Sequence, residues 1–159
     1  MLKIAICDDT REERELVEQY AKRYFDTRKQ PAEFDIFHSM QDVLDTGRAY
    51  DLYLLDVLMP GKSGIQGAAD LLKLYADPVI IFITSSLESA VDSYRVCASG
   101  FLLKPVGRED FEETMDRVCR QRLSLPQASL SVIVNRVPVE LSLERISHFE
   151  NRLHKVYAT

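Results

Sequence analysis

The stretch LYLLDVLMPGKSGIQGAADLLKLY, residues 52–75, decides the fold class of this chain. Its first four residues are almost all apolar, which is typical of a β-strand covered on both faces, and this run ends at Asp56. Residues 59–64 are rich in turn formers, and from Ile65 to Tyr75 apolar residues recur at helical spacing. The stretch therefore predicts a buried strand followed by a helix.

The same strand-then-helix unit recurs on both sides of this stretch. Ser39 and Asp42 resemble a capping box that opens the second helix. Parallel strands need a crossover connection, which helices supply, so we expect an α/β fold with a doubly wound, five-stranded parallel sheet between helices. The predicted strands are residues 2–7, 34–37, 52–55, 78–84 and 101–103.

The composition excludes several other classes of protein. The chain has 159 residues, of which 46% are apolar and 28% charged, and these values exclude disorder and collagen. No apolar run reaches the roughly 20 residues that a bilayer span requires. The first residues enter a strand-like run without a signal-peptide pattern. We therefore expect a cytoplasmic protein that does not contact membranes.

The cysteines indicate no disulfide framework and no metal site. Cys7, Cys97 and Cys119 are odd in number and show no paired spacing, so neither disulfides nor a zinc site are indicated. We expect all three to be buried free thiols.

Charge and pattern divide the chain near residue 124. Residues 1–119 carry 14 Lys/Arg and 22 Asp/Glu, whereas residues 120–159 carry 6 and 3, which suggests two parts with different partners. Leu125-Pro126-Gln127 is typical of a linker, and residues 131–141 alternate as strands do. We expect a first domain over 1–122, a linker over 123–129 and a short β-rich fragment over 130–159.

Polar residues follow the predicted strands at the edge where open α/β sheets bind ligands. They are Asp8, Asp9, Asp56, Thr84 and Lys104. Neighbouring carboxylates repel by about 4 kcal/mol per pair at an effective dielectric near 20, so a cation is required. Mg²⁺, a hard ion that binds carboxylates and phosphate together, fits this set. Asp56 is then the candidate nucleophile that becomes an aspartyl phosphate.

These residues resemble the bacterial response-regulator receiver domain, in order and approximate spacing, over residues 1 to about 122. The resemblance implies a flavodoxin-like (CheY-like) fold of strand order 2-1-3-4-5. It implies that a sensor histidine kinase phosphorylates Asp56 and that the domain modifies only itself, without turnover of external substrates. The matching residues are Asp8-Asp9, Asp56-Val57-Leu58-Met59-Pro60 with Gly64, Thr84-Ser85 and Lys104-Pro105.

The resemblance also assigns roles to individual residues. Phe101 is the aromatic switch residue, and because it lacks the hydroxyl of the more usual tyrosine we expect rotation without a hydrogen bond in the outward form. The face made by the fourth helix, fifth strand and fifth helix is the expected homodimer and output surface. The implied Mg²⁺ ligands are Asp8, Asp9, Asp56 and the backbone carbonyl of Leu58; Thr84, Ser85 and Lys104 contact the phosphoryl group, and Pro105 follows a cis bond.

The tail resembles the opening of a LytTR DNA-binding domain, through Val137-Pro138-Val139, residues 143–150 and residues 156–159. This resemblance implies a LytR/AlgR-type transcriptional regulator whose complete C-terminal domain binds DNA, with only its beginning in residues 130–159. Arg152, His154 and Lys155 are candidate DNA contacts, since basic residues supply the salt-dependent part of affinity. A solvated turn is the alternative for these three.

Other functions remain open as alternatives. A receiver in a phosphorelay, or one used as an interaction module, would have no DNA output, and a metal-dependent phosphatase would act on external substrates. Gly61-Lys62-Ser63 resembles the end of a P-loop, but Asp56 stands where that motif needs glycine. Asp8-Asp9-Thr10 loosely resembles the haloacid-dehalogenase phosphatases, whose aspartates are separated by one residue. We also hypothesise that Leu58 shields the acyl phosphate from water.

Overall fold

The computed structural model describes residues 1–123, 129–134, 137–142, 149–152 and 155–158. By its internal contacts the chain divides into two compact units, Met1–Leu123 and Ser124–Thr159. None of the helices in the described part combines the length and the apolar character that a membrane span needs.

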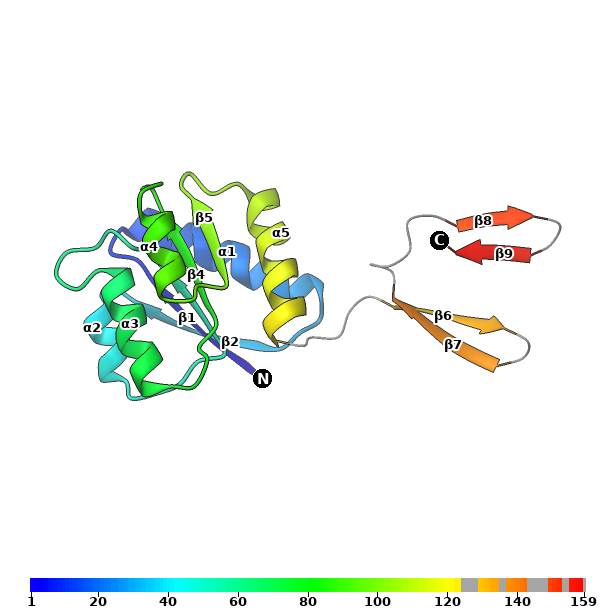
Figure 1. Cartoon of the computed structure of the whole chain (residues 1–159), viewed down its shortest axis with the longest axis horizontal. Helices are drawn as coiled ribbons and strands as arrows, with labels where there is room; N and C mark the ends of the chain where they lie inside the picture. The colour runs from blue at the N-terminus through cyan, green and yellow to red at the C-terminus, as the bar shows by residue number, and fades with distance from the viewer. Residues whose placement is uncertain (124–128, 135–136, 143–148, 153–154, 159) are drawn as a thin grey trace. The chain divides into compact units, whose positions relative to one another are not determined.

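The first unit is a five-stranded parallel sheet with strand order β2-β1-β3-β4-β5 (Figure 1). This confirms the predicted fold class and strand order. The strands are β1 (Leu2–Cys7), β2 (Ala32–Phe37), β3 (Leu52–Leu55), β4 (Ile80–Thr84) and β5 (Gly100–Leu103). The helices are α1 (Arg11–Thr27), α2 (Met40–Asp45), α3 (Gly64–Leu74), α4 (Ser89–Arg95) and α5 (Arg108–Val118), which continues into a π-helical turn, η1 (Cys119–Leu123).

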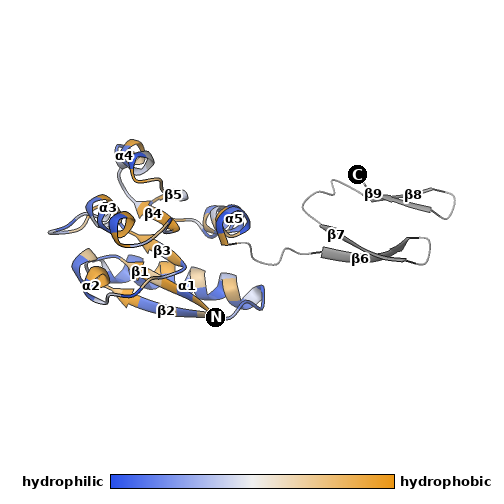
Figure 2. Cartoon of the chain, turned by 60° about the horizontal axis from the view of Figure 1, so that its bottom comes forward, coloured by the Kyte–Doolittle hydropathy of each residue, from blue (hydrophilic) through white to orange (hydrophobic). Residues whose placement is uncertain are grey.

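Helices cover both faces of this sheet because alternate residues of each strand point to opposite sides. The central strands β3 and β4 are almost wholly apolar, whereas the edge strand β2 carries Glu33 and Asp35. The longer helices carry one polar and one apolar side (Figure 2). On one side, α1 packs against α5, where the hydroxyl of Tyr24 donates to Asp116 at 2.7 Å. On the other side, α2 packs against α3. The middle of the sheet, β3 and β4, is therefore buried, and the loops are left to build the site.

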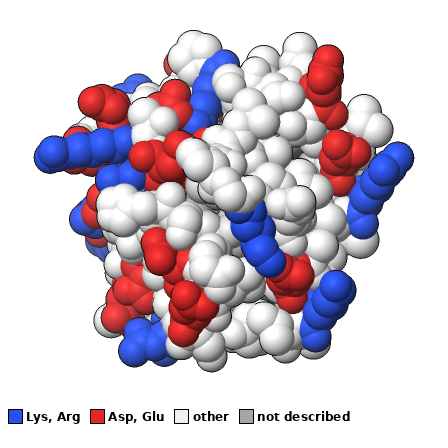
Figure 3. Space-filling view, turned by 90° about the vertical axis from the view of Figure 1, so that its left-hand side faces the viewer, with Lys and Arg blue, Asp and Glu red and all other residues white. Residues whose placement is uncertain are grey.

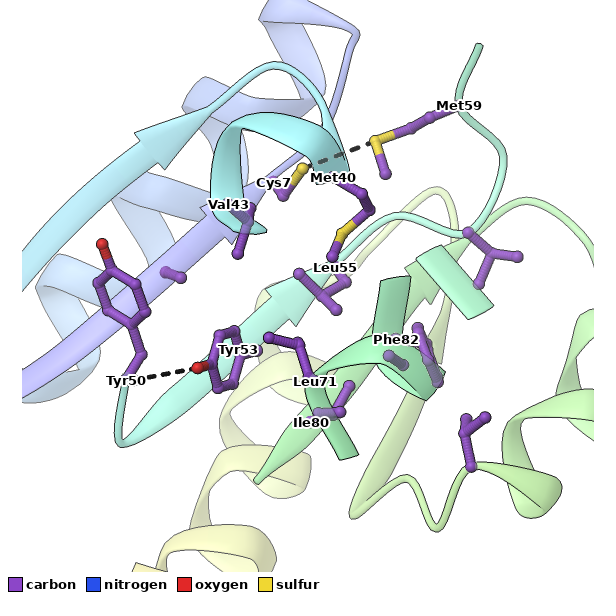
Figure 4. Close-up of a cluster of buried hydrophobic side chains, with 14 residues drawn as sticks. Cys7, Met40, Val43, Tyr50, Tyr53, Leu55, Met59, Leu71, Ile80 and Phe82 are labelled. Atoms are coloured by element: carbon purple, nitrogen blue, oxygen red, sulfur yellow. Dashed lines mark hydrogen bonds between the residues drawn. The ribbon is translucent and has the colours of Figure 1, made fainter. Parts of the chain in front are cut away.

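A cluster of buried side chains joins the sheet to α2 and α3 (Figure 4). Its strand members lie two residues apart, as one face of a pleated strand requires. Full burial of a Val, Leu, Ile, Phe or Met side chain contributes about 1.5–3 kcal/mol to stability. The cluster includes Ala5 and Cys7 of β1, Tyr53 and Leu55 of β3, Ile80 and Phe82 of β4, Met40 and Val43 of α2, and Ala68 and Leu71 of α3.

The helix caps differ from the expected pattern. At Ser39 only half of the predicted capping box forms, with the Asp42 backbone N–H donating to the Ser39 hydroxyl at 3.2 Å. Aspartate is one methylene shorter than the Glu or Gln that closes such a box. A complete box opens α3 instead, between Ser63 and Gln66. It fixes the start of α3 beside the loop that follows β3.

The expectation of three buried thiols is wrong for Cys97. Cys7 and Cys119 are buried, and burial raises the pKa of their thiols to about 12 and about 11. Cys97 is exposed, in the turn between α4 and β5, where its φ is +52°. The chain reverses direction here, and the neighbouring Val96 takes the buried position.

The second unit is rich in β-structure, as expected. β6 (Ser129–Val134) and β7 (Val137–Ser142) pair antiparallel, and β8 (Phe149–Arg152) and β9 (Lys155–Ala158) form a second antiparallel pair. Asn135 and Arg136, within the stretch 131–141 that is predicted to alternate as strands do, lie outside the described residues.

Candidate functional site

Parallel pairing brings three carboxylates together at the carboxyl edge of the sheet. Cys7 at the end of β1 is in register with Leu55 at the end of β3, and the Asp56 backbone N–H donates to the Cys7 carbonyl at 2.9 Å. The side chains that follow these strands, those of Asp8, Asp9 and Asp56, each place a carboxylate oxygen within 4.8 Å of the others. Asp8 and Asp56 are each only 4% exposed. The site therefore holds two carboxylates away from water, while that of Asp9 is exposed.

Lys104 supplies the opposing charge from the end of β5. Its Nζ lies 2.8 Å from Asp8 Oδ2 and 3.3 Å from Asp56 Oδ2, and it also contacts Glu13 Oε2. The Lys104 backbone N–H donates to the Thr84 carbonyl at 2.9 Å, which ties the end of β5 to that of β4. The Lys104–Pro105 peptide bond is cis.

The pKa values reflect burial and charge in competition. Burial raises the pKa of Asp56, and the charge of Asp8 adds to this effect, although Lys104 and the Leu58 N–H oppose it. Burial works against the charge of Lys104, but the hydrogen bonds to Asp8 and Glu13, together with the charge of Asp56, outweigh it and raise its pKa. The single ammonium of Lys104 is therefore shared by three carboxylates.

Backbone groups hold two of these carboxylates in place. The Leu58 N–H donates to Asp56 Oδ1 at 3.2 Å, and the Thr10 N–H donates to Asp8 Oδ1 at 2.9 Å. α3 begins directly against the Asp56 backbone, since a Cβ added to Gly64 would lie 2.1 Å from the Asp56 carbonyl oxygen. The local chain path thus fixes where the Asp56 carboxylate points.

Two residues of α1 belong to the site and were not predicted. Glu13 contacts Lys104, and Arg14, only 8% exposed, donates from Nη1 to the Asp8 carbonyl at 2.8 Å. Both lie in the first turns of the helix that follows Asp8 and Asp9.

The predicted switch residues lie on β4, β5 and the loop after β4. Thr84 is fully buried, and its hydroxyl accepts from the Ser86 N–H at 3.3 Å. Ser85 is exposed. Phe101 pairs in register with Phe82 and packs, partly buried, against the cluster of Figure 4.

The other candidate residues lie on α3 or in the second unit. Lys62, from the P-loop-like sequence, pairs with Asp70 on the side of α3. Arg152 and Lys155 pair across β8 and β9 in the second unit, and His154 lies outside the described residues.

A carboxylate cluster and the ammonium of Lys104 thus meet at the carboxyl edge of a 2-1-3-4-5 parallel sheet. The chain belongs to the response regulator receiver domain family, whose pattern matches residues 4–116. It is thus the receiver domain of a two-component response regulator, which confirms the predicted family.

Relatives with known names support this membership. The chain is 43% identical over 70 residues to the positive alginate biosynthesis regulatory protein of Pseudomonas aeruginosa, across 44% of this chain and 28% of that protein. It is 26% identical over 126 residues to the transcriptional regulatory protein LytR of Staphylococcus aureus, across 76% of this chain and 51% of LytR. The chain therefore spans about half, or less, of the length of these relatives.

Solved structures share the fold. The response regulatory domain of mrkE from Klebsiella pneumoniae matches with a TM-score of 0.69 and 20% identity, covering 78% of this chain and all of that one (100%). The response regulator TrrA from Thermotoga maritima, solved in complex with Mg²⁺ and BeF, matches with a TM-score of 0.64 and 24% identity, over 74% of this chain and 99% of that one.

Proposed function

We propose that Asp56 accepts a phosphoryl group from a sensor histidine kinase. The observation that carries this is the buried Asp56 carboxylate, held by the Leu58 N–H and lying 3.3 Å from Lys104 Nζ. A carboxylate oxygen attacks phosphorus, the bond from phosphorus to the kinase imidazole breaks, and the imidazole nitrogen keeps the electron pair and takes a proton. Phosphoryl transfer needs positioning and charge neutralisation, which these groups supply.

The donor set fits Mg²⁺. Receiver domains bind Mg²⁺ at an acidic pocket, and three carboxylates share such a pocket here. Hard oxygen ligands with uncompensated charge favour this ion. Asp8, Asp9, Asp56 and the Leu58 carbonyl would hold it, and the ion would neutralise charge on the transferred group.

Phosphorylation of Asp56 is proposed to change the conformation of residues on β4 and β5. Thr84 and Ser85 would follow the phosphoryl group, together with Lys104, and Phe101 would rotate in response. Phe101 lines a cavity of about 270 Å³ between α4, β5 and α5, with Ser93 and Arg117 among its other lining residues. Val91 and Leu103, 66% and 42% exposed, add apolar surface to the α4–β5 region. A homodimer through this α4–β5–α5 face is the proposed output.

The second unit is proposed to begin a LytTR-type DNA-binding domain, so that the whole protein regulates transcription in the cytoplasm. Support comes from the resemblance of the tail and from LytR, which is a transcriptional regulatory protein. Arg152, His154 and Lys155 stay candidate DNA contacts. A phosphorelay receiver without DNA output is the alternative, and DNA binding by the full-length protein would decide between the two.

The first prediction tests the phosphoacceptor and the metal together. We expect intact-mass spectrometry to show one added phosphoryl group after incubation with acetyl phosphate and Mg²⁺, because Asp56 is the buried nucleophile. The adduct should be absent from Asp56→Asn and from native protein without divalent metal. An adduct that persists in Asp56→Asn would contradict the assignment, and sustained hydrolysis of an external phosphate ester would instead support the phosphatase alternative.

The second prediction concerns Leu58, which follows Asp56 by two residues and is 53% exposed. Figure 3 shows the face of the molecule from which the β3–α3 loop projects, and much of the middle of that face is uncharged. We expect Leu58→Asn to speed the loss of the phosphoryl group about fivefold, since a polar side chain admits water where an apolar one excludes it, a change of about 1 kcal/mol in the barrier. Leu87→Asn, at a residue 68% exposed on the β4–α4 loop, is the control. Equal dephosphorylation rates in Leu58→Asn and native protein would refute a shielding role.

A further inference from the structure

The Lys104 ammonium is shared among three carboxylates. It has three N–H donors, and its neighbours are Asp8 Oδ2 at 2.8 Å, Asp56 Oδ2 at 3.3 Å and Glu13 Oε2. Its side chain is only 9% exposed, so water has little access to it. A phosphoryl oxygen on Asp56 can therefore gain a hydrogen bond from Lys104 only if one of these contacts is given up.

Glu13 differs from the other two partners. It comes from the first turn of α1, its side chain is 43% exposed, and its carboxylate is not part of the acidic cluster of Asp8, Asp9 and Asp56. Asp8 and Asp56 would exchange Lys104 for a metal ion, which then compensates their charge. Glu13 would gain no metal ion in place of Lys104, so its attraction for Lys104 would persist when the metal binds.

We propose that Glu13 is a positioning residue that holds Lys104 away from the incoming phosphoryl group and so slows phosphorylation of Asp56. This inference rests on the proposed function. The contact keeps Lys104 in its unphosphorylated arrangement, and the Glu13 charge repels a group that itself carries nearly two negative charges. Because Glu13 is half-exposed, it can turn towards water and release Lys104, so it delays the transfer without preventing it.

The test compares Glu13→Gln with Glu12→Gln. Both residues lie in the first turn of α1 and carry the same charge there, so both substitutions remove the same favourable interaction with the helix dipole. Initial phosphorylation rates are measured by intact mass with acetyl phosphate at saturating Mg²⁺. We expect Glu13→Gln to be about fivefold faster than native protein, as the loss of a partly exposed ion pair of about 1 kcal/mol predicts. Glu12→Gln should match the native rate.

Each outcome separates the two proposals. An increase confined to Glu13→Gln supports the role of Glu13, because general damage to the fold would slow the reaction. Equal rates in the two variants, or a slower Glu13→Gln, overturn that role while leaving Asp56 as the phosphoacceptor. Absence of an adduct from every protein, native included, overturns the proposed function and the inference with it.

Discussion

Lys104→Met should lower the free energy of unfolding by about 3 kcal/mol at neutral pH. Removing one partner of a buried ion pair typically costs 3–5 kcal/mol, because the other charge is left uncompensated. Here Asp8 and Asp56, each 4% exposed, would lose their shared cation. Urea unfolding without divalent ions measures the loss. Mg²⁺ should recover part of it, since the ion is an alternative source of positive charge.

The pH dependence of this loss has a defined sign. The pKa of Lys104 is raised in the folded protein, so its contribution to stability is complete at neutral pH and is lost only as the pH rises through that raised value. Towards acid pH, the carboxylates of the variant become protonated and the deficit should shrink. The raised pKa of Asp56 places part of this recovery above the ordinary range of an aspartate.

A control is available on the surface. Lys62 pairs with a single aspartate, Asp70, and their side chains are 33% and 31% exposed. Lys62→Met should therefore cost less than about 1 kcal/mol and be insensitive to Mg²⁺. Similar losses in Lys62→Met and Lys104→Met would show that burial of the cluster does not set the energy of the pair.

Gly64→Ala should destabilise the domain by about 3 kcal/mol and abolish rapid phosphorylation. The added Cβ would lie 2.1 Å from the Asp56 carbonyl oxygen and 3.0 Å from Val57 Cα. These are backbone atoms, so relief requires moving the chain that carries Asp56, and overpacking of this kind costs about 1–3 kcal/mol or more. The Gly64 N–H also donates to the Val57 carbonyl at 3.0 Å, which limits how far α3 can retreat.

Thermal or urea unfolding and the acetyl phosphate assay together check this prediction. Gly107→Ala is the control, because its added Cβ would meet only Asp110 Oδ2, at an ordinary 3.7 Å. It tests the general effect of alanine at the start of a helix. A Gly64→Ala protein with native stability and a native phosphorylation rate would mean that the β3–α3 loop is softer than its contacts indicate.

The fold was predictable because hydrophobic pattern and topology reinforce each other. Buried parallel strands such as Leu52–Leu55 are uniformly apolar, and crossover helices leave few possible connections. Strand limits were less accurate. β2 begins at Ala32 instead of Phe34, because Leu2 pairs with Ala32 through the backbone. Backbone hydrogen bonds extend a strand beyond its apolar residues, and the pattern of apolar side chains in the sequence does not reveal these bonds.

The aspartates and Lys104 were predictable as site residues because strand ends converge at one edge. Glu13 and Arg14 were missed, since their role depends on how α1 turns as it leaves Asp9, and helical spacing alone gives no such direction. The prediction for Cys97 was wrong because it used the general tendency of cysteine to be buried. That tendency does not show that Cys97 lies in a turn with left-handed backbone. Side-chain reach also decided the outcome at Asp42, where the capping box stayed half formed.

The exposed turn at Cys97 makes the chain suitable for site-specific labelling. Cys7 and Cys119 are buried, and the raised pKa of each thiol keeps it protonated, whereas Cys97 is open to solvent. Thiolates are the reactive form, so a maleimide dye or spin label should attach at one position without any engineered cysteine. That position lies between α4 and β5, next to the proposed output face, and a label there would report its rearrangement directly.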